Sequence, residues 1–448
     1  MERKLKLFAE EKEQQARALA AEFQTNAAPE IWDFYKSAKA GAWQRATNQY
    51  HRLRTRSGAD EGGQPHPSVH GPVWPTVLEV GLAIEMYLSL GPHFTELLTR
   101  DLTNGIPTGS VYLGGTDPGR ALPTAFCASH VRGDPFFTFT QNHFTDWQSL
   151  TCFKQLYEGR LNVLTLEDSQ RCFNEYYEDA GRRAKHDRDF PNAPRQLRPG
   201  EDVRWDGDRL DVRGQVAVMT LNGLMAKSLF DKNPDREFFV EESFPLEWMY
   251  PHLTPHTGIL KINRHQLDRI PPDVIERDRA FWKQRCGQLL GVWLKADTTV
   301  KELCDFVERT YVRRDTTGFT GDRQFLTNWH ARAAYSKLRV AQGGVYFWRI
   351  NQSATIPEEQ DRMIAESDFA FRQAYAMSPS SAEALFRYTN LLISRANVEA
   401  QRGNRRNCLE FMDDAILLAE TSLRVEPRMT AVTELLKNLK AMRKQFEK

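Results

Sequence analysis

The sequence lacks an excess of charge of either sign. Lysine and arginine number 60 and aspartate and glutamate 59, which leaves a formal net charge of +1 over 448 residues. A surface this balanced has no bulk attraction for nucleic acid or for an anionic membrane, so we expect neither as a partner. The most apolar stretch, residues 77–90, contains two glutamates and falls short of the ~20 apolar residues that a membrane span needs.

Motifs for metal and redox chemistry are also missing. The six cysteines stand 18 or more residues apart, so no CxxC pair can begin a zinc site, and we expect core thiols. His252 and His256 are four residues apart, but Pro251 and Pro255 interrupt the helix that would direct both imidazoles at one metal. The charged start of the chain has no apolar core of a secretion signal. These absences predict a soluble, cytoplasmic protein without a metal or cofactor.

What remains is the composition of a globular protein, 41% hydrophobic and rich in aromatic residues. We expect four parts along the chain. They are a helical N-terminal hairpin and linker (1–70), an α/β domain (71–265), a helical connector (266–330) and a helical repeat domain (331–448). In the first part, we expect Gly41 to divide the segment that begins at Pro29 into two short helices.

Between residues 71 and 265, short apolar runs alternate with helical patterns. This alternation favours an α/β fold, a mostly parallel, Rossmann-like sheet with helices on both faces. The expected strands are 110–115, as an interior strand, 136–141, 161–166, 237–242 and 258–263. The expected helices are 76–90, 120–132, 147–158, 168–186, 215–230 and 245–253. Asp206-Gly207, flanked by alternating residues, predicts a hairpin appended to the sheet.

The last part of the chain carries small and aromatic residues at the spacing of tetratricopeptide-like repeats. The matching positions of two second helices are Ser367, Phe371, Ala374 and Pro379, and then Ala415, Ala419, Ser422 and Pro427. A helical repeat cannot bury its apolar face alone, so we expect stacked antiparallel helix pairs. We expect these repeats to bind a protein partner.

The segment from Tyr112 to Arg120 runs from a predicted strand through a glycine-rich turn into a helix, where open α/β sheets place ligands. It has neither GxGxxG nor the GK[ST] of a phosphate loop. Asp117 followed by Pro118 fits a helix N-cap with proline at the first helical position. The alternative is that Asp117 holds a sugar hydroxyl or a metal, and both interpretations remain open.

Two further strand ends would reach the same edge of a parallel sheet. The predicted ligand-binding rim therefore comprises Gly114, Gly115, Thr116, Asp117, Arg120, Asn142, Glu241 and Glu242, with His143 beside it. Paired carboxylates can perform acid–base chemistry or hold a divalent ion. Consecutive strand residues point to opposite faces, however, so one buried and one solvated glutamate is an equal alternative. No GxSxG motif is present, and the catalytic residues are unknown.

Several sequence segments resemble those of a known family. TGSVYLGGTDPGRALPTAF, DPFFTFTQNHFTD and DREFFVEESFPLEWMYPHLTPHTGILKINR resemble the soluble C-terminal region of bacterial protein O-mannosyltransferase-like membrane proteins of the verrucomicrobial type. The resemblance covers residues 74–448. It implies the accessory α/β and repeat module without the catalytic membrane part, so it brings no catalytic residue to this chain.

These observations predict a non-catalytic binding or scaffold protein. Its α/β domain would hold a small polar ligand, a sugar or a glycan, and its repeats would bind protein. One alternative is a glycosyltransferase-related enzyme of glycoconjugate or nucleotide-sugar metabolism that uses Asp117 with Glu241 or Glu242. The other is a structural subunit of a larger assembly.

Overall fold

The computed structural model describes residues 1–58, 65–115, 117–127, 136–206, 209–241, 247–352 and 356–447. The chain forms two compact units, the first made of residues 1–249 with 262–264, and the second of residues 250–261 with 265–448. The four-part division expected from composition stays a prediction. Within the described ranges, no helix combines the length and the apolar character that crossing a bilayer requires.

The predicted mostly parallel α/β fold is wrong. The structure is 68% helical with 6% strand, and its sheets are small and mixed. In the first unit, β1 (Val111–Gly114) lies between β2 (Phe137–Thr140) and β5 (Phe238–Val240), and both pairings are parallel. Strands of three or four residues offer too little surface to carry layers of helices on two faces, so helix-to-helix packing forms most of the core.

Two of the expected elements are not formed. Residues 161–166 do not become a strand, because the backbone N–H of Asn162 donates to the side chain of Asn233 (3.0 Å) and a helix already begins at Leu166. The described part of the expected helix at 245–253 is turns and a short 3-10 helix, η2 (Tyr250–His252), with β6 (Leu253–His256) following. Its prolines remove the backbone donors and the space that a helix needs.

Other local predictions are confirmed. All four residues of β1 are buried and pair with β2, and Val111 to Leu113 also pair with β5, so β1 is an interior strand. The two strands of the predicted hairpin are present as β3 (Asp202–Asp206) and β4 (Arg209–Arg213), which pair antiparallel, but they form a separate two-stranded sheet and are not appended to the other sheet as expected. Gly41 ends the second helix in the left-handed conformation (φ 76°), where glycine carries no steric cost.

The helices of the first unit are α1 (Glu2–Glu22), α2 (Pro29–Ala40), α3 (Trp43–Arg56), α4 (Trp74–Thr103), α5 (Asp117–Phe126), α7 (Trp147–Tyr157), α8 (Leu166–Asp189) and α9 (Gln215–Lys232). The first four pack on one another, and Gly81 permits the closest approach. A Cβ added at Gly81 would lie 2.2 Å from the ring of Tyr50, which also stacks on Trp74. Only glycine fits at position 81 without moving that aromatic pair.

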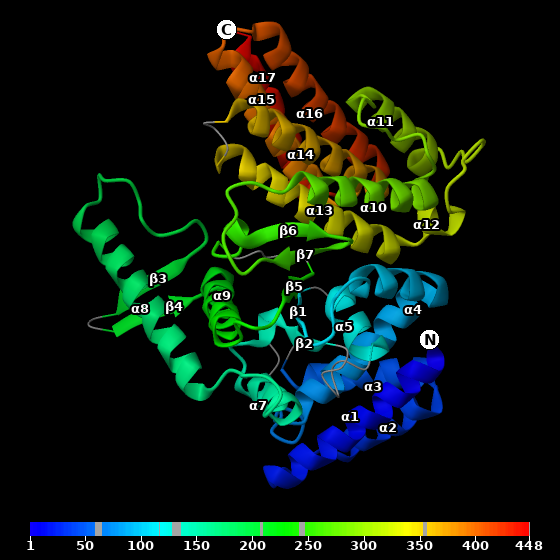
Figure 1. Cartoon of the computed structure of the whole chain (residues 1–448), viewed down its shortest axis with the longest axis vertical. Coiled ribbons are helices and arrows are strands. Elements are labelled where there is room, and N and C mark those ends of the chain that lie inside the picture. The colour runs from blue at the N-terminus through cyan, green and yellow to red at the C-terminus, as the bar shows by residue number, and fades with distance from the viewer. Residues whose placement is uncertain are drawn as a thin grey trace. The chain divides into compact units, whose positions relative to one another are not determined.

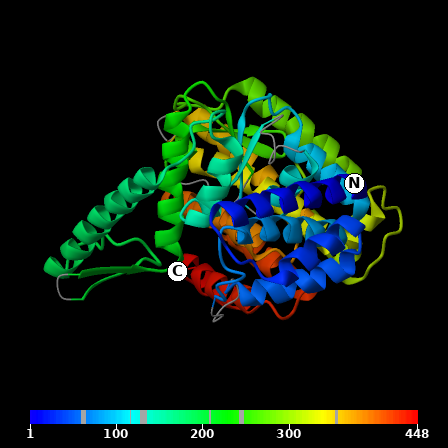
Figure 2. The same ribbon diagram turned by 90° about the horizontal axis from the view of Figure 1, so that it is seen from below.

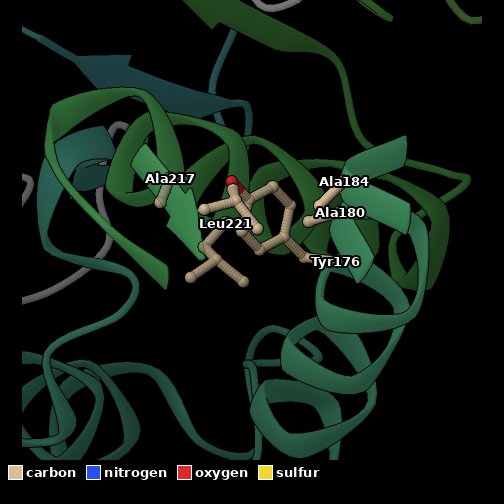
Figure 3. Packing of buried hydrophobic residues seen from close by; sticks show 6 residues of the cluster. Tyr176, Ala180, Ala184, Ala217 and Leu221 are labelled. Atoms are coloured by element: carbon tan, nitrogen blue, oxygen red, sulfur yellow. The ribbon is translucent and has the colours of Figure 1, made fainter. Parts of the chain in front are cut away.

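The α8 helix and the β3–β4 hairpin lie side by side and share a small core with α9 (Figures 1 and 2). Figure 3 shows this core, in which residues from α8 and α9 point toward one another. The buried cluster consists of Tyr176, Ala180, Ala184, Val203, Ala217 and Leu221. The alanines leave room for the tyrosine ring, so the separate β3–β4 sheet has an apolar contact with α8 and α9.

A short segment distant in sequence completes the end of α9. Arg264 donates to the carbonyl oxygens of Phe230 (2.8 Å), Asn233 (2.8 Å) and Arg236 (2.9 Å), and its guanidinium lies over the ring of Phe230. The last carbonyls of a helix have no intrahelical partner and carry a partial negative charge, so an arginine there satisfies both needs.

The helices of the second unit are α10 (Pro272–Leu290), α11 (Val300–Val307), α12 (Arg323–Thr327), α13 (Trp329–Gln352), α14 (Pro357–Met377), α15 (Ala382–Gln401), α16 (Arg405–Val425) and α17 (Thr430–Phe446). A π-helical turn, η3 (Glu308–Val312), follows α11, and β6 neighbours β7 (Ile259–Ile262). Successive helices from α13 to α17 pack on one another (Figure 1). Helices are therefore present where the repeats were expected, and the tetratricopeptide assignment stays a prediction.

A charge pair at the centre of the second unit joins several of these elements. Arg339 on α13 and Asp278 on α10 are both 0% exposed and lie 2.8 Å apart. Arg339 also donates to Gln373 on α14 (2.7 Å), and Tyr346 donates to Asp278 (2.9 Å). Gln342, one turn from Arg339, accepts from Arg339 and donates to backbone carbonyls of the β6–β7 hairpin.

Replacing Asp278 with alanine is expected to lower the free energy of unfolding by ~3–5 kcal/mol, because Arg339 would remain buried without its counter-charge. Urea unfolding of the full chain measures the change. Glu276→Ala, on an exposed position of the same helix, is the control and is expected to stay within ~0.5 kcal/mol. Equal stability of the two variants would contradict the role assigned to the pair.

Candidate functional site

The carboxyl ends of β1, β2 and β5 meet at a glycine-rich turn. The buried carboxylate of Glu241, which follows β5, accepts a hydrogen bond from the backbone N–H of Gly115 (3.0 Å). The same carboxylate lies against Gly119 in the first turn of α5, where an added Cβ would come within 1.8 Å of its Cδ. Glu241 therefore ties the end of one strand to the turn after another.

This position is the one at which a strand–turn–helix unit presents backbone N–H groups and the positive end of a helix dipole to an anion. Here the chain supplies its own anion, the Glu241 carboxylate. A second anion such as a phosphate would meet that charge directly. The geometry accordingly favours an uncharged polar ligand over a phosphate at this turn.

Asn142 lies at the same edge, in η1 (Gln141–His143) directly after β2. Its amide nitrogen donates to the carbonyl of Gly115 at 3.3 Å. Its amide oxygen is buried and has no hydrogen-bond partner in the part of the chain that the structure describes. Buried amide oxygens are nearly always satisfied, so this one marks a place for a donor from a ligand or water.

Arg120 and His143 form the other side of the edge. The Arg120 guanidinium lies 3.1 Å from His143 Nε2. Burial, with the positive charge of Arg120 adding to it, lowers the pKa of His143 to about 3. The imidazole is thus neutral at physiological pH, and its Nε2 accepts a hydrogen bond from Arg120.

The structure thus brings Gly114, Gly115, Arg120, Asn142, Glu241 and His143 to one edge. The remaining predicted residues, Thr116 and Glu242, together with the side chain of Asp117, lie outside the described residues. Whether Asp117 caps α5 or holds a ligand therefore stays open, and the rim as a ligand site stays a prediction.

Sequence reasoning missed two residues that shape this edge. The hydroxyl of Tyr112 donates to the carbonyl of Gly119 at 2.5 Å and closes the turn from below β1. Gly119 itself is needed because the Glu241 carboxylate occupies the space of a side chain. A glycine at position 119 in a predicted helical turn was visible in the sequence. Its contact with Glu241 was not, because Glu241 lies more than 100 residues away.

Metal chemistry finds no support among the described residues, where no group of three histidine, cysteine or acidic side chains gathers. The cysteines are free thiols, and all but Cys127 are buried. Comparison with known proteins adds no identity: no family model matches the chain, and no significant match exists among the curated proteins or the solved structures.

The contact between Gly119 and Glu241 gives a double-mutant test. Gly119→Ala is expected to lower the free energy of unfolding by ~1–3 kcal/mol, since the added Cβ displaces a buried, hydrogen-bonded carboxylate. In a Glu241→Ala background the same change is expected to be neutral or stabilising, because alanine favours a helix over glycine by ~1 kcal/mol. Gly287→Ala in α10, where an added Cβ makes only an ordinary contact, is the helical control. Additive effects of the two changes would refute the contact.

The low pKa of His143 predicts how stability depends on pH. Between about pH 6.5 and 3 the unfolded chain binds a proton that the folded chain does not, so unfolding becomes easier by up to ~1.4 kcal/mol per pH unit as pH falls. His143→Gln keeps an acceptor for Arg120 and removes this contribution. Between pH 7 and pH 4, the free energy of unfolding measured in urea should therefore fall less for His143→Gln than for wild type. The control His70→Gln, at an exposed position, should lose as much as wild type. Parallel curves for His143→Gln and wild type would contradict the burial of a neutral imidazole.

Proposed function

We propose that this chain is a non-catalytic binding protein. Its first unit holds an uncharged, hydroxyl-rich molecule, a sugar or the end of a glycan, at the Gly115 turn. The observation that carries the proposal is the arrangement of Asn142 and Glu241, in which Asn142 presents an oxygen acceptor at a strand edge and the Glu241 carboxylate repels phosphate. Hydroxyl groups donate hydrogen bonds to such oxygens.

The alternative of an enzyme that uses Glu241 receives less support. Glu241 is buried and accepts from Gly115, so its carboxylate is engaged in holding the turn rather than poised beside a reacting group. A general base needs to reach the proton that it removes. We extend the proposal to the resemblance noted above, and regard the chain as corresponding to the accessory part of O-mannosyltransferase-like proteins.

Calorimetry of the full chain against neutral monosaccharides, nucleotide sugars and inorganic phosphate tests the ligand. A neutral sugar is expected to bind, and Asn142→Ala is expected to weaken it by ~10-fold through loss of one buried polar contact. The control is Asn174→Ala, an exposed asparagine of α8 whose amide pairs only with Gln170 in the described chain. Asp117→Asn distinguishes the two roles left open for that residue, a helix cap and a charged ligand contact, since asparagine caps a helix as well as aspartate does but carries no charge.

Three outcomes would contradict the ligand proposal: no binding of any neutral sugar, tighter binding of phosphate than of sugar, or an equal loss in the Asn174→Ala control. Thermal unfolding of each variant confirms that it is folded before affinity is compared.

The second part of the proposal is a protein partner for the helix pairs of the second unit. It rests on the repeat spacing and on the consecutive packing of α13 to α17. Native co-purification is expected to retain a partner protein in stoichiometric amount. This partner should dissociate only when the second unit unfolds. Recovery of the chain alone would contradict this part.

A further inference from the structure

The second unit contains a pocket of about 760 Å³ that the function proposed above does not use. Its wall comes from η3, the loop after it, α12 and the start of α13, with the loops that follow α14 and α16 closing the far side. All of these segments belong to the same compact unit. The pocket is therefore a feature of one folded body.

The charged residues that line this pocket are mostly positive. Arg314, Arg323 and Arg332 line it, and Glu426 is the acidic residue in its described lining, which leaves a formal charge of +2. None of the three arginines forms an ion pair within the described chain.

The neighbouring arginines behave differently. Arg313 and Arg424 both pair with Glu308, at 3.7 Å and 2.8 Å. Arg313 and Arg424, beside the pocket, thus have a counter-charge, while the three arginines of the lining form no ion pair among the described residues. Unpaired arginines gathered in a concavity are the usual means of binding carboxylate or phosphate.

Arg332 is held in place by an aromatic ring. Its guanidinium lies 5.0 Å from the ring centre of Tyr311, and its Nε is buried without a hydrogen-bond partner in the described chain. The Tyr311 hydroxyl shares its proton between the carbonyl oxygens of Ala376 (3.0 Å) and Met377 (3.2 Å), and its oxygen accepts from the Arg332 side chain. Tyr311 therefore serves to fix Arg332 and leaves a guanidinium donor for a ligand.

The backbone around the pocket is unusual at two places. The N–H of Arg313 donates to the carbonyl of Glu308, five residues earlier, which is the π-helical pattern. Arg314 has a φ of 55°, a conformation uncommon for any residue but glycine. Both features occur preferentially at functional sites, and together they set the position of Arg314 after η3.

The pocket also has an apolar side. Trp329 lines it and is 56% exposed, and Leu326 and Val425 lie in the same lining. A ligand that uses both halves would carry an anionic group on an apolar or planar body. A phosphate monoester at neutral pH carries close to two negative charges and matches the formal charge of the lining.

We propose that this pocket binds a phosphate monoester of an apolar or aromatic molecule, with the phosphate between Arg314, Arg323 and Arg332 and the body against Trp329. The assignment is independent of the sugar site in the first unit.

Calorimetry of the full chain with phenyl phosphate, inorganic phosphate and benzoate tests this assignment. Phenyl phosphate is expected to bind at least ~10-fold more tightly than either of the others, because only it has both the dianion and the ring. The double variant Arg314→Gln/Arg323→Gln changes two exposed residues, so folding is preserved, and is expected to weaken phenyl phosphate by ~10–100-fold.

The matched control is Arg313→Gln, which removes the same charge one residue away and leaves Glu308 paired with Arg424. It is expected to bind phenyl phosphate within ~2-fold of wild type, because a screened charge outside the pocket contributes little. Trp329→Ala is expected to abolish the preference for phenyl phosphate over inorganic phosphate. The assignment is overturned if wild type does not bind phenyl phosphate, if benzoate binds as tightly, or if Arg313→Gln loses as much affinity as the double variant.

Discussion

The buried charge pair between Asp278 and Arg339 is the constraint on which the second unit depends. A guanidinium without access to water needs a counter-charge and hydrogen-bond acceptors, and the elements that supply these groups to Arg339 cannot shift independently. Asp278 fixes α10 against α13, while Gln373 brings α14 to the same point. Gln342 extends the network to the carbonyls of the β6–β7 hairpin. The helix pairs that follow, and the loops that enclose the arginine pocket, are built on elements whose register this network sets.

The first unit applies the same principle with a carboxylate and backbone groups. Glu241 satisfies the Gly115 N–H and fills the space over Gly119, so a turn that could otherwise accept a phosphate is closed by the protein itself. The two units therefore treat anions in opposite ways. The first presents an oxygen acceptor beside an internal anion, and the second presents three arginines that form no ion pair among the described residues. This contrast is the basis for assigning a neutral ligand to the first and a phosphorylated one to the second.

Local patterns predicted the elements better than they predicted the fold. Gly41 marked a helix end, the Asp206-Gly207 hairpin formed, and the apolar run around Tyr112 became an interior strand, since each depends on neighbours in sequence. The run at 161–166 has similar apolar content but is not a strand in the structure, because strand pairing depends on distant partners that composition does not reveal. The strand ends placed Asn142 and Glu241 near Gly115. That Arg314, Arg323 and Arg332 form no ion pair among the described residues depends on tertiary packing, which leaves no signal in the sequence.

The chain leaves the first unit after Met249 and returns to it for Ile262–Arg264 before continuing in the second. Arg264 is the residue that satisfies the end of α9 through three carbonyl oxygens. Neither unit is thus one continuous piece of polypeptide, and no single cut separates them intact. A fragment ending at Met249 would expose the three acceptors that Arg264 covers, so protein engineering that divides this chain must carry residues 262–264 with the first unit or replace them. Evolutionary exchange of either unit by simple fusion meets the same obstacle.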